Sequence, residues 1–368
     1  MALETSFIRR VVLLSAFASA AMMTMPAAAQ VPSPALLIAC WGNGAGSLQI
    51  ADPAMMKVVV SVPLGSLRPH GIAVSPNGKV AYVTLGDVAM GQRAGASDEI
   101  PEDYISVIDL VARKELRRVV IGPGSWPFSI VLVRGKLYYT AEGYGLVGRY
   151  DPVRNQIDQM IGTGQIRSHS LAVSKDGEHI FIANGYSDNV STIGLWDVPA
   201  SQRVPGLAHL DTDLIPRWFA STIPVGHEPE GIALSPDDKE AWVLGRGDGS
   251  LSIIDVATNK ILRTLDLKMK EPFRLAFSAD GKRVLIVSHR DTNVLMFDAV
   301  ARKEIKRIHI GSEIVYQGII APDGSHAFVS VVGDDRVAVI DMNTLEVTGS
   351  ISTSAQPAAM AWAASDRM

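Results

Sequence analysis

Two histidines and one glutamate are the residues of this sequence best suited to binding a metal ion. His70, His169 and Glu230 each lie two residues before the Ile or Leu of a recurring Gly-Ile-Ala-Val-like segment, in three different copies of it. Imidazole and carboxylate groups together suit Zn²⁺, Cu²⁺ or a similar divalent ion, which activates water or polarises a carbonyl. His227 or His289 would add a further ligand. The same residues could instead line a water-filled channel without any metal.

Basic and aromatic residues indicate a second kind of site at the same place. Arg246 and Arg290, together with the histidines, would hold a carboxylate or phosphate while phenylalanines cover the apolar part of the ligand. The alternative is that these arginines pair with nearby acids such as Glu142 or Asp248. The predicted ligand-binding residues are His70, Phe128, His169, Glu230, Arg246, Phe273, His289, Arg290 and Gln317.

Local motifs of well-known catalytic sites are missing from the sequence. It contains no Gly-x-Ser-x-Gly elbow, no His-Glu-x-x-His zinc motif, no Cys-x-x-Cys-His haem attachment and no phosphate-binding loop. Cys40 is the only cysteine, and its apolar surroundings predict a small buried thiol. The motifs leave open whether the chain is an enzyme, because an active site assembled from separate repeats has no local signature.

A repeated pattern of strand, turn and strand provides the elements that must position these residues. Its clearest copy, at 71–84, has an apolar strand, a Ser-Pro-Asn-Gly turn and a second alternating strand. Proline presets φ in such a turn, and glycine takes the positive φ that returns the chain to the ladder. The pattern returns at 171–177, 232–238, 275–281 and 319–324, more weakly at 130–135, and as a half-copy from Met360.

An aspartate that ends a strand and begins a turn gives the number of repeats. Successive ones lie 42 to 58 residues apart, and they are Asp52, Asp109, Asp151, Asp197, Asp255, Asp298 and Asp341. Four strands per repeat at this period are typical of β-propeller blades. The chain starts on a second strand at 36–40 and finishes on a first strand at 358–362. The sequence therefore predicts an all-β fold, a seven-bladed β-propeller of four-stranded antiparallel blades, with the last blade closed by both termini.

The repeats resemble the YVTN-type seven-bladed β-propeller family, which has lactonase-like members. Tyr82-Val83-Thr84 is the closest literal match, and 253–260 is the clearest turn segment. The likeness covers essentially the whole chain after its first 29 residues. It implies the propeller fold. For function it implies a wide choice, because such propellers include binding modules, lactone-hydrolysing enzymes and parts of periplasmic redox systems.

The first 29 residues have the pattern of a cleavable signal peptide. Arg9 and Arg10 begin it, an uncharged stretch follows, and Ala27-Ala28-Ala29 supplies the small-residue cleavage site. We expect cleavage after Ala29, a single propeller domain over 30–368, and a periplasmic or secreted protein. The apolar run is too short to remain as a membrane span. A formal net charge of −4 without basic runs argues against nucleic acid as a partner.

Two long intervals between aspartates predict insertions at about 86–103 and 199–220. The first should lie on the face of the candidate site, as a lid or an acidic docking surface, unless it is a plain solvated loop. The second should lie on the opposite face. Its Arg217-Trp218-Phe219 would suit a protein contact, unless the rings pack on their own blade.

Taken together, these features predict a monomeric propeller that binds a small molecule or a protein partner at the mouth of its central channel. The first alternative is a metal-assisted hydrolase or lyase, similar to lactonase-type propellers, that uses His70, His169 and Glu230. The second alternative is an accessory protein of a periplasmic redox system. A divalent metal is the only cofactor to which the residues point.

Overall fold

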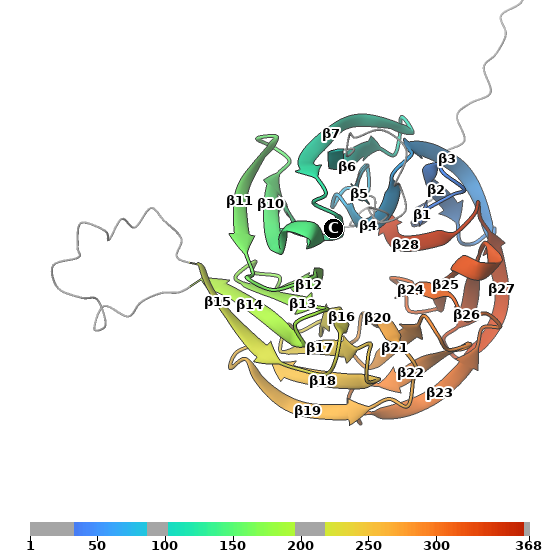
Figure 1. Cartoon of the computed structure of the whole chain (residues 1–368). Helices are drawn as coiled ribbons and strands as arrows, with labels where there is room; N and C mark the ends of the chain where they lie inside the picture. Colours follow the sequence, from blue (N-terminus) through green and yellow to red (C-terminus); the bar gives the residue numbers. More distant parts are fainter. Residues whose placement is uncertain (1–32, 87–101, 196–217, 364–368) are drawn as a thin grey trace, which may run out of the picture. The chain divides into compact units, whose positions relative to one another are not determined.

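In the computed structural model, which describes residues 33–86, 102–195 and 218–363, seven four-stranded antiparallel sheets surround one axis (Figure 1). Six sheets are consecutive in the chain, and each is given from its innermost strand outward: β4 (Arg68–Val74), β5 (Val80–Gly86), β6 (Glu102–Asp109), β7 (Lys114–Pro123); β8 (Pro127–Val133), β9 (Lys136–Ala141), β10 (Leu146–Asp151), β11 (Gln156–Gly162); β12 (Ser168–Val173), β13 (His179–Asn184), β14 (Asn189–Leu195), β15 (Trp218–Pro224); β16 (Pro229–Leu234), β17 (Glu240–Gly245), β18 (Ser250–Asp255), β19 (Lys260–Asp266); β20 (Pro272–Phe277), β21 (Arg283–Ser288), β22 (Asn293–Asp298), β23 (Lys303–His309); β24 (Val315–Ile320), β25 (His326–Val331), β26 (Arg336–Asp341), β27 (Glu346–Ser352). The chain is a seven-bladed β-propeller.

The remaining sheet combines strands from the two ends of the described chain. Its order is β28 (Pro357–Ala363), β1 (Ala35–Cys40), β2 (Gly46–Asp52) and β3 (Lys57–Gly65). β28 pairs antiparallel with β1, so that Leu36 lies opposite Trp362 and Ile38 opposite Met360. This pairing joins the two ends of the described chain in one sheet by hydrogen bonds and so closes the ring.

The turns form as the residue types predict. In the first complete blade, the Gly78 amide donates to the Ser75 carbonyl at 2.8 Å, Asn77 accepts from the Lys79 amide at 3.1 Å, and Gly78 has φ of 67°. In the blade β24–β27, at the turn between the third and fourth strands, the Asp341 carboxylate accepts from the amides of Asn343 and Thr344, each at 2.8 Å. The same arrangement occurs at Asp52, Asp109, Asp151 and Asp298. Asp197 lies outside the described residues.

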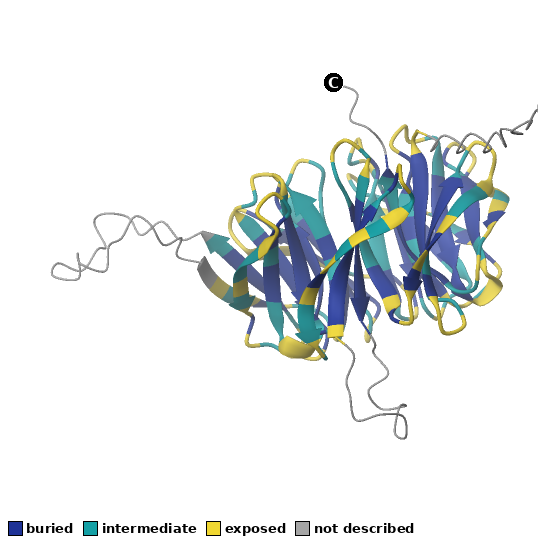
Figure 2. Cartoon of the chain, turned by 90° about the horizontal axis from the view of Figure 1, so that it is seen from above, coloured by how far each residue is buried: buried dark blue, intermediate teal, exposed yellow. Residues whose placement is uncertain are grey.

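The hydrophobic core lies between neighbouring blades, where the faces of adjacent sheets meet. Figure 2 shows buried residues along the middle of the strands and exposed residues at the turns. Trp242 is the largest fully buried side chain, and it packs against Phe277 and Phe297 of the next blade. Cys40 is a free, fully buried thiol, as predicted, and burial raises its pKa to about 11.

One glycine makes the inter-strand packing testable. A Cβ at Gly148 on β10 would lie 2.1 Å from Cζ of the Tyr139 ring, whereas a Cβ at Gly162 on β11 would meet nothing within 4 Å. We expect Gly148→Ala to lower the free energy of unfolding by about 1–3 kcal/mol, because the ring must move. Gly162→Ala in the same blade is the control and should change it by less than about 0.5 kcal/mol. Urea denaturation of both variants measures the difference, and equal values would contradict this packing.

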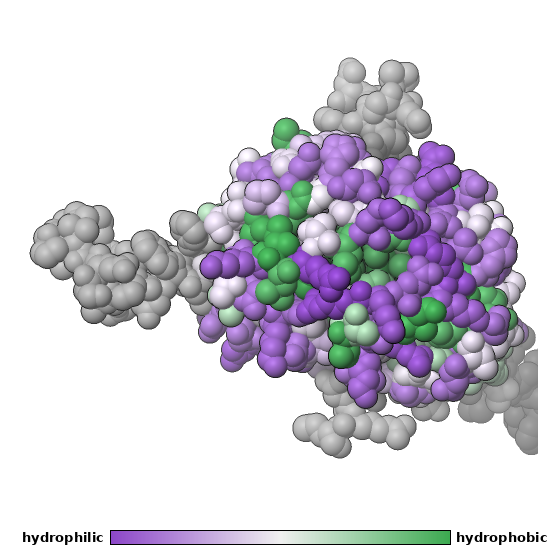
Figure 3. Space-filling view, turned by 90° about the horizontal axis from the view of Figure 1, so that it is seen from below, coloured by the Kyte–Doolittle hydropathy of each residue, from purple (hydrophilic) through white to green (hydrophobic). Residues whose placement is uncertain are grey.

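The outer strands form a mainly polar rim. Figure 3 shows one side of the ring as largely hydrophilic, with apolar patches between the polar groups. β19 and β23 carry exposed apolar side chains, including Leu262 and Ile305. Among the described residues, no helix is long and apolar enough to cross a membrane.

Candidate functional site

A β-bulge in every innermost strand turns one side chain of each blade toward one end of the axis, which we call the channel mouth. Pairing of β12 with β13 shifts between Ser168 and Ser170, so His169 is the extra residue. Pairing of β16 with β17 shifts in the same way around Glu230, and pairing of β20 with β21 around Phe273. The other four inner strands shift register at the corresponding place. Because a bulge re-aims the side chain that it contains, seven repeats present seven side chains to one region.

The bulge also corrects one predicted position. Ile320 on β24 pairs with Ala327 in the way that Val74 on β4 pairs with Ala81, which makes Tyr316 the equivalent of His70. The prediction of Gln317 for this position was wrong by one residue, because Gly318 corresponds to Ile72 and not to Gly71: it pairs with Val329 as Ile72 pairs with Val83. Gln317 instead accepts a hydrogen bond from the Met360 amide at 2.7 Å and so links β24 to β28.

Threonine hydroxyls on the second strands fix the bulges of neighbouring blades. Thr84 accepts from the Gly71 amide at 2.8 Å and donates to the Phe128 carbonyl at 2.9 Å. Thr140 accepts from the Ser129 amide at 3.0 Å and donates to the His169 carbonyl at 2.7 Å. Each hydroxyl therefore ties its own bulge to the next one, which sets the positions of Phe128 and His169.

Aromatic rings fill the centre of the mouth. The Phe128 ring lies between two imidazoles, with centroids 4.9 Å from His70 and 3.8 Å from His169. Phe273 stacks on His289 at 3.7 Å, and Tyr316 packs against Phe273 at 5.3 Å. Trp41, which directly follows β1, packs against Tyr316 at 5.1 Å. The predicted residues Phe128, His169, Phe273 and His289 are thus brought into one cluster.

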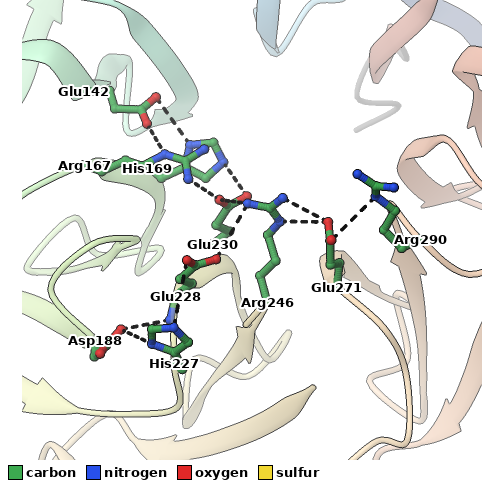
Figure 4. A network of polar contacts seen from close by, with 10 residues as sticks. All are labelled: Glu142, Arg167, His169, Asp188, His227, Glu228, Glu230, Arg246, Glu271 and Arg290. Atoms are coloured by element: carbon green, nitrogen blue, oxygen red, sulfur yellow. Dashed lines mark hydrogen bonds and ion pairs between the residues drawn. The ribbon is translucent and has the colours of Figure 1, made fainter. Parts of the chain in front are cut away.

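A buried ionic network adjoins the rings (Figure 4). The Arg167 guanidinium bridges two carboxylates, with Nε 2.6 Å from Glu142 Oε1 and Nη1 2.5 Å from Glu230 Oε1. The His169 imidazole lies between the same two carboxylates, 3.5 Å from Glu142 and 3.4 Å from Glu230. Arg246 continues the network, 3.3 Å from Glu230 and 2.9 Å from Glu271. Sequence reasoning missed Arg167 and Glu271.

The positive charges of this network keep its two buried carboxylates ionised. Burial alone would raise the pKa of Glu230, but His169, Arg167 and Arg246 outweigh it and hold that pKa well below the usual range. Glu142 has a lowered pKa for the same reasons, with His169 and Arg167 opposing burial. Both carboxylates are therefore ionised near neutral pH.

Two histidines of the mouth are held neutral. Burial lowers the pKa of His70 to about 4 and that of His289 to about 3. Both nitrogens of His70 are buried without a hydrogen-bond partner. An imidazole without a partner acid in an apolar site favours its uncharged form.

The predicted metal ligands do not converge. The Phe128 ring separates His70 from His169, and two arginines take up the Glu230 carboxylate. His227 lies apart, 59% exposed, with Nδ1 3.0 Å from Asp188 Oδ1. Within the described ranges, no group of three or more His, Cys, Asp or Glu side chains is arranged to hold a metal ion. This geometry speaks against a metal shared by His70, His169 and Glu230.

A polar pocket of about 750 Å³ opens beside the network. Arg246 and Glu271 belong to both, and the predicted Arg290 lines the pocket on its far side, 66% exposed and 3.6 Å from Glu271. The arginines are thus paired with acids, as one alternative foresaw, although the partners are Glu271 and Glu230 rather than Glu142 or Asp248. The other lining residues are His227, Glu228, Gly247, Asp248, Gly249, Met269, Lys270 and Glu313.

The two predicted insertions are described only in part. Residues 87–101 and 196–217 lie outside the described residues, as does the predicted signal peptide 1–29. The second insertion, predicted at about 199–220, ends earlier than predicted, because β15 begins at Trp218 and pairs with β14. Phe219 lies opposite Gly194 in this pairing.

Comparison with known proteins supports the fold more than any one activity. The family model for the cytochrome D1 heme domain matches residues 236–363, about a third of the chain, and this match does not show the YVTN family. None of the curated protein sequences matches the chain.

Several solved structures share the fold of this chain over nearly the full length of both chains. A periplasmic gluconolactonase from Pseudomonas aeruginosa is 17% identical, with a TM-score of 0.66 and coverage of 90% of this chain and 99% of that one. A protein from Lactobacillus plantarum is 13% identical, with a TM-score of 0.68 and coverage of 90% and 99%. Hydrazine synthase from Kuenenia stuttgartiensis is 18% identical, with a TM-score of 0.62 and coverage of 87% and 98%. The chain resembles lactonase-like propellers in fold.

Proposed function

We propose that this propeller is a binding protein for a small hydroxy acid, which it holds in the polar pocket at the channel mouth. The pocket itself carries the proposal, because about 750 Å³ lies in the range of small-molecule sites and charged groups converge on it. The predicted leader places this binding in the periplasm or outside the cell.

The charges that line the pocket suit a ligand with both an anionic group and hydrogen-bond donors. Lys270 is exposed and, among the described residues, has no acidic partner, and Arg290 has only a long contact to Glu271. These two cations would take the carboxylate. Glu313 and Glu228 would accept from hydroxyl groups.

Binding fits the geometry better than catalysis. A general base must come within hydrogen-bond reach of its substrate, but His169 and Glu230 have side chains only 1% exposed. Both already contact other charged groups of the network. A metal-assisted hydrolase would need His70, His169 and Glu230 to meet at one ion, and they do not.

The match to the cytochrome D1 heme domain supports the redox alternative, in which the chain is an accessory protein of a periplasmic redox system, but the described residues do not themselves fit a haem. A haem needs an apolar slot and an axial ligand such as histidine. His289 is the only histidine of the matched segment at the mouth, and its ring is stacked on Phe273. The adjoining pocket is lined mainly by charged side chains.

Isothermal titration with gluconate, a six-carbon hydroxy acid, tests the proposal. We expect saturable binding to the wild type and about 10- to 100-fold weaker binding to the double variant Lys270→Met, Arg290→Met, because two charge-assisted contacts are lost. Arg263→Met is the control, since Arg263 is exposed on β19 in a neighbouring part of the ring. Absence of binding to the wild type, or equal affinity in the double variant, would contradict the proposal.

A further inference from the structure

Arg274 is a cation on an innermost strand, at a position where the repeated pattern does not call for a charged residue. It follows Phe273 on β20, at a position occupied in five other blades by small residues and in the sixth by Gln317; the small ones are Gly71, Ser129, Ser170, Gly231 and Ala359. Two of the small residues are required by close packing, because a Cβ at Gly71 would lie 2.6 Å from the Phe128 carbonyl oxygen and a Cβ at Gly231 2.5 Å from that of Phe273. A long charged side chain at this crowded position is therefore a departure from the architecture.

The guanidinium of Arg274 lies among aromatic rings. Its Cζ is 4.7 Å from the Phe273 centroid, 4.9 Å from that of Phe128 and 5.9 Å from that of Tyr316. One N–H group donates to the Ser170 hydroxyl. A guanidinium has five N–H donors, so most of them remain available to a ligand.

No carboxylate forms an ion pair with Arg274 in the described part of the chain. The acids of the mouth contact other cations: Glu142 contacts Arg167, Glu230 contacts Arg167 and Arg246, and Glu271 contacts Arg246. Arg274 is thus half-buried among apolar rings without an anion of the protein beside it.

Two further buried groups near Arg274 have no hydrogen-bond partner. The Tyr316 hydroxyl is one by its distances and angles, and burial raises its pKa to about 12, although the charge of the adjacent Arg274 guanidinium and its approach to the hydroxyl act against this. Its O–H is therefore a donor at neutral pH. His70, stacked on Phe128, is the other, and as a neutral imidazole it carries one N–H donor. A buried donor without an acceptor costs about 1–3 kcal/mol, so such donors usually face water or a ligand.

We propose that Arg274 and Tyr316 form a binding site for a small planar oxyanion, such as the carboxylate of a short monocarboxylic acid. The guanidinium supplies a fork of donors that matches a carboxylate, and the Tyr316 hydroxyl adds one more. The aromatic walls favour a weakly hydrated anion. They disfavour phosphate, whose transfer from water into these rings costs more.

This site goes beyond the proposed hydroxy-acid pocket, and its residues are different. Lys270 and Arg290 line the pocket, whereas Arg274 and Tyr316 do not. The two sites therefore respond to different substitutions, and one can fail without the other.

Titration with sodium acetate at constant ionic strength tests the oxyanion site. We expect acetate to bind the wild-type protein and phosphate to produce no comparable effect. Arg274→Met keeps the aliphatic stem and should weaken acetate binding by about 10- to 100-fold. Arg263→Met removes an exposed arginine and should leave acetate binding unchanged.

Crystals soaked in bromide locate the anion directly. Bromide is expected to give an anomalous peak beside the Arg274 guanidinium in the wild type and none in Arg274→Met. No acetate binding to the wild type, bromide only at Lys270 and Arg290, or unchanged acetate affinity in Arg274→Met would each overturn the site. If Arg274→Met does not fold, Tyr316→Phe decides instead. It should bind acetate several-fold more weakly, and an unchanged affinity would overturn the proposal.

Discussion

At pH 5 the protein is expected to be less stable than at pH 7 by about 3 to 4 kcal/mol, because of two buried histidines. The pKa of His70 is about 4 and that of His289 about 3 in the folded protein, whereas both return to the ordinary value of 6.5 on unfolding. The unfolded chain therefore binds more protons between these values. The part of the free energy of unfolding that depends on these two histidines is fully present above pH 6.5 and is lost as the pH falls toward 4.

The carboxylates of the mouth act in a lower pH window. Glu142 and Glu230 have lowered pKa values, so their contribution is lost only as the pH falls below the unfolded value of about 4.3. Urea denaturation at pH 7, 6 and 5 therefore isolates the histidines. The variant His70→Phe, His289→Phe should lose most of this pH dependence, while His309→Gln, exposed on β23, should keep it. A wild-type curve that is flat from pH 7 to 5 would refute the prediction.

Replacing Arg167 by methionine should lower the free energy of unfolding by about 3–5 kcal/mol. The substitution leaves Glu142 and Glu230 buried without the cation that bridges them. Of these two carboxylates, Arg246 contacts only Glu230. It also removes the guanidinium from the face of the Tyr186 ring, 4.9 Å away.

Arg167→Lys separates charge from geometry in the same network. Lysine keeps the positive charge but not the planar fork that contacts both carboxylates, so an intermediate loss is expected. Arg263→Met should change stability by less than about 0.5 kcal/mol. Chemical denaturation at pH 7 gives all three values. A loss below about 1 kcal/mol for Arg167→Met would mean that the network does not stabilise the mouth.

The sequence predicted the fold because the propeller repeats the same local chemistry. Each turn has its own proline, glycine or aspartate, and each blade supplies an independent copy of the signal. The positions His70, Phe128, His169, Glu230 and Phe273 followed from the same register. Gln317 failed because Gly318-Ile319 resembles Gly71-Ile72 in sequence, although Gly318 holds the position of Ile72 in its strand.

The contacts between blades could not be predicted in this way. Arg167 meets Glu142 and Glu230 only because three blades converge, and no spacing along the chain encodes that meeting. The geometry speaks against the predicted metal site, and the sequence could not show this, because it does not reveal that the Phe128 ring lies next to both histidines. Arg274 did leave a signal, as a large residue where five other blades have Gly, Ser or Ala.

The bulge in each inner strand makes the mouth a set of separately exchangeable positions. Each blade contributes one side chain there, and at Phe128 and His169 a hydroxyl of the preceding blade also holds the backbone. A substitution at one of these positions changes a single wall of the site and leaves the other six in place. Such a scaffold can acquire a new ligand by one replacement at a time, without passing through sequences that no longer fold.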